Sequence, residues 1–122
     1  MLDILRPLHV ALLVSDLDQA EQFYGHVLGL PQVDRPLNFP GLWYQVGQLQ
    51  LHLMLAVGST SSPLHNAERW GRNAHLAFAV KDLEAAKTAL LNAGFLVQLS
   101  GSGRAALFSQ DPDGHVIELS QG

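Results

Sequence analysis

Two ten-residue phrases of this sequence, LHVALLVSDL and AHLAFAVKDL, each carry a histidine in second place, His9 and His75. The same offset of 66 residues relates His52 to Glu118. Imidazole and carboxylate groups are both ligands of divalent transition metals. Two such pairs at equivalent positions of a repeat would converge on one point if a pseudo-two-fold axis related the two copies. The sequence therefore predicts one metal site formed by all four residues.

Each of these residues also has a simpler explanation. A single histidine on an apolar strand is more often a hydrogen-bonded core residue than a metal ligand. Glu118, in the apolar context HVIELS, would be costly to bury unless it is paired or bound to a metal, and it could instead face solvent at a sheet edge. The joint pattern of four ligand-type residues favours the shared metal site over four unrelated explanations.

Three further histidines are not expected to be ligands. His26 lies near the predicted end of a helix, where an interaction with the helix dipole is sufficient explanation. His65 lies in a polar connecting segment. His115 alternates with Glu118 along one predicted strand, so it should point to the opposite side of that strand.

Each ten-residue phrase is predicted to form a strand that leads into a helix. Apolar residues recur at helical spacing over residues 17–27 after the N-cap residue Asp16, and over residues 83–91 after the N-cap residue Asp82. Gly94 is expected to end the second helix. Six further strands are expected at residues 32–35, 42–46, 49–56, 95–100, 105–109 and 115–120.

The chain is therefore predicted to contain two copies of a β-α-β-β-β unit in one domain, with module one at residues 1–57, a linker at 58–73 and module two at 74–122. One helix covers only one face of a four-stranded sheet, so two units would leave their uncovered faces around a shared cavity. Along residues 49–56, leucines alternate with a mixed face that carries His52. We expect an α+β fold in which an incomplete eight-stranded barrel surrounds a metal cavity.

The composition excludes several classes of site and partner. The 122 residues contain no cysteine, which excludes disulfides, thiolate metal sites and a cysteine nucleophile. A formal charge of -4 and scattered basic residues argue against nucleic acid or an acidic membrane as a partner. The apolar stretch at residues 8–14 is too short and too polar for a convincing signal peptide, and no apolar run approaches membrane-spanning length. We expect a cytoplasmic protein.

These residues and the segments around them resemble the vicinal oxygen chelate superfamily, which includes glyoxalase I, fosfomycin-resistance thiol transferases, methylmalonyl-CoA epimerase, extradiol dioxygenases and bleomycin-resistance proteins. The segments that carry the resemblance are HVALLVSDLDQAEQFYGHVLGL, LQLHLML, RNAHLAFAVKDLEAAKTALLNAGF and GRAALFSQDPDGHVIEL, which cover nearly the whole chain. Together they are specific for the superfamily and weak for any single activity.

The resemblance implies that His9, His52, His75 and Glu118 bind a divalent metal whose open positions take two adjacent oxygens of a small substrate. The metal would act as a Lewis acid on a developing enediolate or oxyanion. Glyoxalase I and the epimerase usually have Glu or Gln at the position of His52. The histidine here therefore leaves the identity of the metal undecided. Three imidazoles and one carboxylate suit Ni, Zn, Fe, Co or Mn better than Mg or Ca. In glyoxalase I the glutamate equivalent to Glu118 is also the catalytic base, which implies that role here.

Three other residues are candidates for substrate binding. Arg104 follows the flexible segment SGSG and could bind a carboxylate, a phosphonate or a thiolate-bearing tail, or could be a solvated loop arginine. Trp43 and Phe108 are candidates for the wall of the pocket, as is Tyr44, and the parity of each strand decides between the pocket and the core.

The leading hypothesis is a glyoxalase-like lyase or isomerase. An Fe(II) extradiol-type dioxygenase is one alternative, although a fourth ligand at His52 would crowd the positions that catechol and oxygen need. A non-catalytic drug- or metabolite-binding protein of bleomycin-resistance type is another, although such proteins generally lack the metal ligands. In this superfamily the two units can pair within one chain or between chains, and we expect a homodimer. The substrate, and whether a thiol such as glutathione is a cosubstrate, stay open.

Overall fold

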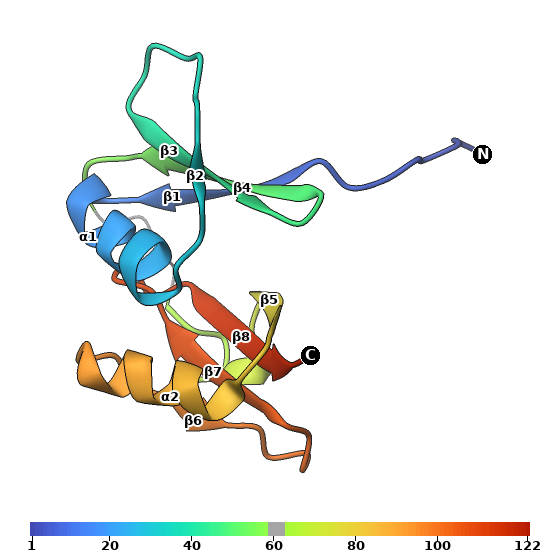
Figure 1. Ribbon diagram of the computed structural model, residues 1–122, viewed down its shortest axis with the longest axis vertical. Helices are drawn as coiled ribbons and strands as arrows, with labels where there is room; N and C mark the ends of the chain where they lie inside the picture. Colours follow the sequence, from blue (N-terminus) through green and yellow to red (C-terminus); the bar gives the residue numbers. More distant parts are fainter. Residues whose placement is uncertain (59–62) are drawn as a thin grey trace. The chain divides into compact units, whose positions relative to one another are not determined.

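The repeat in the sequence corresponds to a repeat in the structure. The computed structural model describes residues 1–58 and 63–122 (Figure 1), and the chain divides into two units, Met1–Thr60 and Ser61–Gly122. In each unit a strand is followed by a helix and then by three further strands. The predicted β-α-β-β-β modules are therefore confirmed.

The elements follow the predicted order, with ends that differ by a few residues. In unit 1 they are β1 (His9–Val14), α1 (Leu17–Glu21), the π-helical segment η1 (Gln22–Val27), β2 (Gln32–Val33), β3 (Gly41–Val46) and β4 (Leu49–Leu55). In unit 2 they are the 3₁₀ turn η2 (Trp70–Arg72), β5 (His75–Val80), α2 (Leu83–Asn92), β6 (Gln98–Leu99), β7 (Ala106–Gln110) and β8 (Val116–Gln121).

Each unit contains one mixed four-stranded sheet. The strand orders are β1-β4-β3-β2 and β5-β8-β7-β6, and in each sheet the first and last strands of the unit pair in parallel while the other pairs are antiparallel. The α+β fold class is confirmed. Among the described residues no strand pairing joins the two sheets, so their eight strands are not closed into a barrel. The incomplete barrel around a metal cavity stays a prediction.

Both predicted N-caps are present. The side chain of Asp16 accepts a hydrogen bond from the backbone N–H of Gln19 at 3.0 Å, and that of Asp82 accepts one from Ala85 at 3.0 Å. These bonds satisfy backbone donors that the first turn of a helix leaves unpaired. After α2, Gly94 adopts φ of 88°, a left-handed conformation that glycine tolerates best, and the helix ends there as predicted.

The first helix changes its winding after one and a half turns, which the apolar spacing did not predict. From Gln22 it continues as a π-helix, in which the backbone N–H of Leu28 donates to the carbonyl of Phe23, five residues earlier, at 2.9 Å. Both Phe23 and Tyr24 are fully buried. A π-helix offsets the side chains from the α-helical spacing, so two adjacent aromatic residues can both enter the core.

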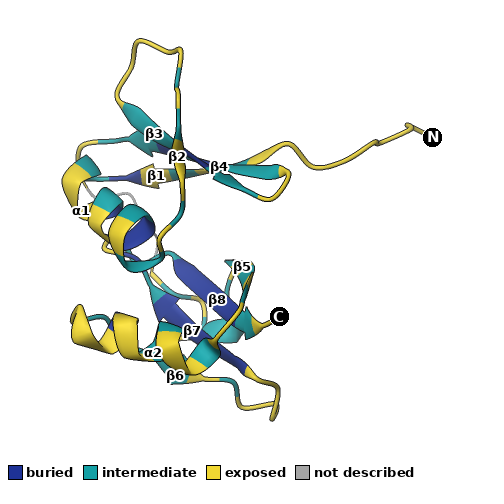
Figure 2. Cartoon of the chain, viewed as in Figure 1, coloured by how far each residue is buried: buried dark blue, intermediate teal, exposed yellow. Residues whose placement is uncertain are grey.

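The two faces of β4 differ as the sequence predicts. Leu51 and Leu53 are fully buried, whereas His52 between them is half-buried on the opposite face. In unit 2, α2 packs on β7 and β8, and Figure 2 shows that burial in this unit is concentrated in these two strands. The core of each unit therefore lies on one face of its sheet. The candidate ligands alternate with the core residues along their strands, so they are on the other face.

The candidate ligands lie at equivalent places in the two parallel strand pairs, as the 66-residue offset predicts. His9 lies opposite the residue two positions before His52, and His75 lies opposite the residue two positions before Glu118. Because side chains two residues apart on a strand point to the same side, each pair shares one face of its sheet.

The antiparallel neighbours β3 and β7 are related by an offset of 65 residues instead. Trp43 pairs with His52, and Phe108 pairs with Glu118. A uniform offset would have matched Trp43 to Ser109. The structure therefore makes Trp43 and Phe108 equivalent, although the repeat in the sequence does not align them.

The turn between β7 and β8 explains why the offset is 65 residues for β3 and β7 but 66 for β4 and β8. The Oδ1 atom of Asp111 accepts hydrogen bonds from the backbone N–H groups of Asp113 and His115, both at 2.9 Å. Gly114 in this turn adopts φ of 87°. Three residues separate Asp111 from His115, whereas two separate the equivalent pair Val46 and Leu49, so this DPDG turn is one residue longer and shifts β7 against β8 relative to the first unit.

None of the described helices is long and apolar enough to cross a lipid bilayer.

Replacing the N-cap of α2 should destabilise the protein measurably. Asp82→Ala is expected to lower the free energy of unfolding by about 1 kcal/mol, because the first turn of α2 loses its side-chain acceptor. Asp82→Asn keeps an oxygen at this position and should lose much less. Urea denaturation followed by circular dichroism measures both, with Asp3→Ala in the exposed N-terminal segment as the control. Equal stability of Asp82→Ala and Asp3→Ala would contradict the capping role.

Candidate metal centre

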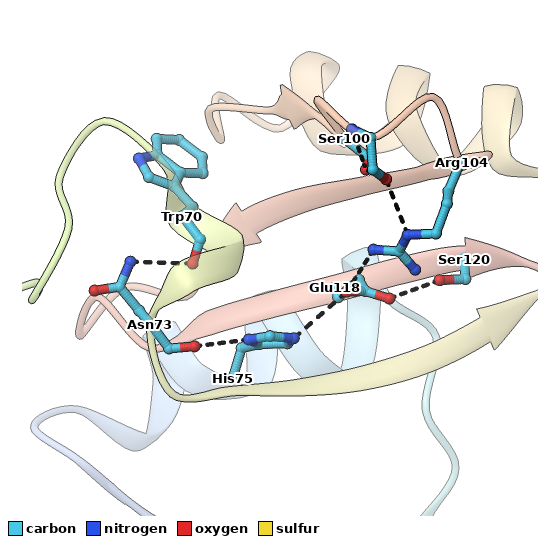
Figure 3. Close-up of polar contacts among 8 residues, drawn as sticks. Trp70, Asn73, His75, Ser100, Arg104, Glu118 and Ser120 are labelled. Carbon is cyan, nitrogen blue, oxygen red and sulfur yellow. Dashed lines mark hydrogen bonds and ion pairs between the residues drawn. The ribbon is translucent and has the colours of Figure 1, made fainter.

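The two candidate ligands of unit 2 are in contact (Figure 3). His75 lies on β5 and Glu118 on the neighbouring strand β8, and His75 Nε2 is 3.4 Å from Glu118 Oε1. The parallel register of these strands places both side chains on the same face, one diagonal step apart. Local strand pairing therefore brings this half of the predicted ligand set together.

The ring of His75 is held in a defined orientation. Its Nδ1 donates a hydrogen bond to the backbone carbonyl of Asn73 at 2.7 Å, and the Asn73 side chain is itself tied to three backbone carbonyls of the preceding turn. Phe108 packs edge-on against the ring, with centroids 5.6 Å apart and an interplanar angle of 86°. In the neutral ring the free lone pair is then on Nε2, which faces Glu118. Metal-binding histidines are commonly oriented in this way by a backbone carbonyl.

Glu118 is buried, with 7% of its surface exposed, yet it is surrounded by groups that favour its charge. Burial by itself would raise the pKa of this carboxyl. The hydrogen bond from Ser120 Oγ to Oε2 at 2.8 Å, the Arg104 guanidinium 3.5 Å from Oε1 and the neighbouring His75 together hold the pKa below its ordinary value. Glu118 is therefore a carboxylate at neutral pH, the form that binds metals and accepts protons.

The spacing of these two donor atoms fits one bound ion. Zinc bonds to histidine nitrogen and carboxylate oxygen are about 2.0–2.2 Å long, so two donors at neighbouring corners of a tetrahedron lie about 3.4 Å apart. The nitrogen and oxygen of this pair are 3.4 Å apart. The pair in unit 2 therefore has both the donor types and the separation that a divalent transition metal requires.

The two candidate ligands of unit 1 lie in an aromatic stack with His52 in the middle. The His52 ring centroid is 4.1 Å from that of His9 at an interplanar angle of 13°, and 4.1 Å from that of Trp43 at 6°. His52 Nε2 donates to Gln50 Oε1 at 2.9 Å. Burial, followed by the nearby His9 and Arg35, lowers the pKa of His52, so this ring is neutral at pH 7. Neutral imidazole is the metal-binding form.

The stacked rings do not point toward one ion. A metal lies close to the plane of each imidazole that binds it, about 2.1 Å from the nitrogen, and two nearly parallel planes do not meet near their rings. At least one of His9 and His52 must rotate about its side-chain torsions before both can bind the same metal. Unit 1 thus has suitable donor types in an arrangement that metal binding would have to change.

Among residues 1–58 and 63–122, no group of three or more histidine, aspartate or glutamate side chains is close enough to hold a metal ion. The candidate ligands occur as one pair in each unit. The site of four ligands, His9, His52, His75 and Glu118, stays a prediction.

The three aromatic residues considered for the pocket wall lie on different faces of their strands. Trp43 stacks on His52, and its structural equivalent Phe108 packs against His75. Tyr44, the next residue along β3, is fully buried in the core, and its hydroxyl has no hydrogen-bond partner among the described residues. Burial raises the pKa of Tyr44 to about 12. Trp43 and Phe108 therefore lie beside the candidate ligands, and Tyr44 does not.

Arg104 is more than a solvated loop residue. Its Nη2 contacts Glu118, and its Nε donates to Ser102 Oγ at 3.1 Å, while 56% of its side chain stays exposed (Figure 3). Ser102 is in turn hydrogen-bonded to Ser100 at 2.8 Å. The cation is held at the candidate centre with part of its surface available to a ligand.

Three residues that orient the ligands were missed at the level of sequence, namely Asn73, Gln50 and Ser120. Gln50 and Ser120 each lie two residues from a ligand on the same strand, so the two-residue alternation of strands contained a signal for them. The role of Asn73 depends on the conformation of the turn that precedes β5, and no motif in the sequence indicates it.

The family described as the Glyoxalase/Bleomycin resistance protein/Dioxygenase superfamily matches residues 6–119, which span both units. The chain belongs to this superfamily. The match confirms the resemblance that the repeated histidine phrases indicated, and it leaves open which activity of the superfamily this member has.

Two relatives with glyoxalase-type names have similar sequences. Glyoxylase I 4 of Arabidopsis thaliana is 31% identical over 118 residues, which cover 91% of this chain and 67% of the relative. A "Probable lactoylglutathione lyase" of Vibrio parahaemolyticus is 31% identical over 129 aligned residues, which cover 95% of this chain and 90% of the relative.

The chain is also similar to a relative whose name indicates a different activity and, separately, to a protein of solved structure. Metapyrocatechase of a Pseudomonas species is 33% identical over 125 residues, 95% of this chain and 38% of the relative, so the chain spans little more than a third of that protein. The crystal structure of a lactoylglutathione lyase from Agrobacterium tumefaciens superposes with a TM-score of 0.67 at 25% identity and covers 94% of this chain and 92% of that one.

A methyl group at Gly71 should disturb the centre through Phe108. A Cβ atom at Gly71 would lie 2.5 Å from Phe108 Cζ, and Phe108 is only 5% exposed and packs on His75. Gly71→Ala is therefore expected to cost about 1–3 kcal/mol of stability, as overpacking typically does, and to shift the proton NMR signals of the His75 ring.

The matched control is Gly101→Ala, because a Cβ atom there would approach only the mobile end of the Arg69 side chain, at 2.9 Å. Its effect on stability should stay within about 0.5 kcal/mol. Equal destabilisation by the two variants, or an unchanged His75 signal in Gly71→Ala, would show that Phe108 does not transmit the change.

Proposed function

We propose that this member of the superfamily is a glyoxalase-like, divalent-metal-dependent enzyme that acts as a lyase or isomerase on a small substrate with two adjacent oxygens. The observation that carries the proposal is the pair formed by His75 and Glu118, an oriented imidazole and an ionised carboxylate whose donor atoms are 3.4 Å apart. A buried carboxylate in this position is costly unless it is paired or bound to a cation.

The proposed metal ligands are His9, His52, His75 and Glu118. The support for joining the pairs of the two units is the 66-residue repeat, which holds in the register of the parallel strands that carry them. Nitrogen-rich donors of this kind favour Ni, Zn, Fe, Co or Mn over Mg or Ca. The homodimer and the cytoplasmic location expected from the sequence are part of the same proposal.

The catalytic base in this proposal is Glu118. Its two oxygens are held from different sides, Oε2 by Ser120 and Oε1 by Arg104, so the carboxylate has a fixed direction. It would take the carbon-bound proton from the hydroxyl-bearing carbon next to a substrate carbonyl and return it to the former carbonyl carbon, while the hydroxyl proton moves to the former carbonyl oxygen, so that the carbonyl and hydroxyl groups exchange places. A bound divalent metal would supply Lewis-acid polarisation of the two substrate oxygens.

The contact with Arg104 offers a way to adjust the basicity of Glu118. The guanidinium lowers the pKa of this carboxyl, which makes it a weaker base. If Arg104 turned from Glu118 to an anionic group of the substrate, the pKa of Glu118 would rise and the base would become stronger. Substrate binding and activation of the base would then be coupled through one side chain.

Metal content is the first test of this proposal. Protein purified without chelators is expected to contain close to one transition metal ion per chain, measured by mass spectrometry. His75→Ala and His9→Ala each remove a proposed ligand, so they should weaken metal binding by more than roughly 10–100-fold. That range is typical when a residue that only hydrogen-bonds to a metal ligand is replaced. His65→Ala, in the connecting segment, should keep full occupancy. Protein that contains no metal and binds none of Ni, Zn, Mn or Fe(II) on titration would contradict the proposal and favour a non-catalytic binding protein.

Loss of the base should remove turnover more completely than it removes metal. Metal-loaded wild type is expected to isomerise the hemithioacetal of glutathione and methylglyoxal, or a related α-hydroxycarbonyl compound, with exchange of the carbon-bound proton in D₂O followed by NMR. Glu118→Gln should be slower by about 10²–10⁴-fold, the usual contribution of a general base. Its metal content is measured in the same sample, and full activity at equal metal content would exclude Glu118 as the base.

The similarity to metapyrocatechase keeps an Fe(II) extradiol-type dioxygenase as the second candidate. That activity requires open positions on the iron for both catechol and oxygen, and a fourth ligand at His52 would occupy one of them. Oxygen uptake by the Fe(II)-loaded protein in the presence of catechol, increased rather than abolished in His52→Ala, would favour this candidate over the lyase or isomerase.

A further inference from the structure

A cavity of about 560 Å³ lies within unit 2, and its lining is rich in arginine. Arg69 and Arg72 come from the segment around η2, and Arg104 comes from the loop before β7. The hydroxyl-bearing residues Ser100 and Ser102 also line it. Guanidinium and hydroxyl groups around one space form a typical binding site for a carboxylate or a phosphate.

The charges of this cavity are not balanced by the protein. The guanidinium groups of Arg69 and Arg72 form no ion pair or hydrogen bond with any residue in the described ranges, whereas Arg104 is paired with Glu118. Among the described residues of the lining, the one carboxylate is that of Glu68. With Arg104 neutralised by Glu118, two arginines still face one carboxylate, so the cavity keeps a net positive charge.

The backbone that carries the two unpaired arginines is held firmly. Gln98 on β6 bridges the segment, since its Nε2 donates to the carbonyl of Glu68 at 2.8 Å and its Oε1 accepts from the backbone N–H of Trp70 at 2.9 Å. The side chain of Asn66 accepts from the backbone N–H of Arg69 at 2.8 Å. Little backbone ordering would therefore be needed when a ligand binds, which lowers the entropic cost of binding.

The cavity adjoins the candidate metal centre through two shared residues. Arg104 lines the cavity and contacts Glu118 Oε1 at 3.5 Å, and Phe108 lines the cavity and packs against His75. A molecule that occupied the cavity would lie next to the pair formed by His75 and Glu118. All of these residues belong to unit 2.

We propose that this cavity binds an anionic group, a carboxylate or a phosphoryl-type oxyanion, through Arg69 and Arg72. If the proposed function holds, this group is the tail of the substrate, and the substrate class is a small anionic molecule whose two adjacent oxygens lie at the metal centre. Arg69 and Arg72 then determine specificity, and Arg104 connects the anion to the base.

Binding of two simple anions to metal-free protein tests this proposal without any turnover. Calorimetric titrations with inorganic phosphate and with succinate, at constant ionic strength, are expected to show saturable binding of at least one of them, and which one binds distinguishes a phosphoryl-type group from a carboxylate. The variant R69Q/R72Q should bind it about tenfold more weakly or worse, since charge-assisted hydrogen bonds are lost.

The matched control is K81Q/K87Q, which removes the same charge from unit 2 outside the cavity lining. It should bind like the wild type. Amide NMR spectra of the wild type provide a measurement that needs no variant, with the signals of Gly71 and Gly101 expected to shift on titration. Binding of neither anion, or equal weakening in both double variants, would overturn the proposal. Because the protein is metal-free, this failure would leave the metal test of the proposed function unaffected.

Discussion

The parallel pairing of the first and last strands of each unit is the constraint on which the rest of the structure depends. Parallel neighbours cannot be joined by a tight turn and need a longer connection, which in each unit contains a helix and two further strands. Once β1 lies beside β4, and β5 beside β8, the register places one ligand-type residue of each strand a diagonal step from the other. The core then forms on the opposite face, where leucines of β4 and apolar residues of β8 are buried.

The same placement has different chemical consequences in the two units. In unit 2 the partner of the histidine is a carboxylate, which cannot stack on the ring, so His75 Nε2 and Glu118 Oε1 meet edge to edge at 3.4 Å. In unit 1 the neighbours are flat aromatic rings, and His52 is sandwiched between His9 and Trp43. Stacking gives the rings favourable aromatic contacts, but the lone pairs of their nitrogens then do not point toward a common position. In the proposed metal site, the donors of unit 2 already have a suitable spacing, whereas His9 and His52 would have to give up their ring stack to bind the same ion.

Charge in unit 2 is distributed so that the centre and the cavity depend on each other. Glu118 stays ionised despite its burial because Ser120 and Arg104 stabilise the charge. Among the residues that the structure describes, Arg104 is the one of the three cavity arginines whose charge is matched by a carboxylate. An anion in the cavity would compete with Glu118 for this guanidinium, and a metal on Glu118 would release the guanidinium to the cavity. The electrostatics of the candidate centre and of the cavity are therefore linked by the side chain of Arg104.

The sequence by itself determined the elements and the ligand-type residues, because these follow from local chemistry and from periodicity. Asp16 and Asp82 are N-caps whatever the helices pack on, and the alternation along β4 separates Leu51 and Leu53 from His52 before any fold is known. The 66-residue repeat related His9 to His75 and His52 to Glu118 as equivalent positions of the two units, and the register of the parallel strands then places His9 near His52 and His75 near Glu118.

The tertiary structure alone decided how these groups are oriented and what surrounds them. The extra residue in the DPDG turn shifted β7 so that Phe108 rather than Ser109 faces Glu118. The ring stack of His9 and His52 and the arginines that share one cavity arise from contacts between distant segments, and the hydrogen bond from His75 to the Asn73 carbonyl arises from the conformation of the turn before β5. Such contacts depend on side-chain torsions and loop conformations, which leave no periodic signal in the sequence.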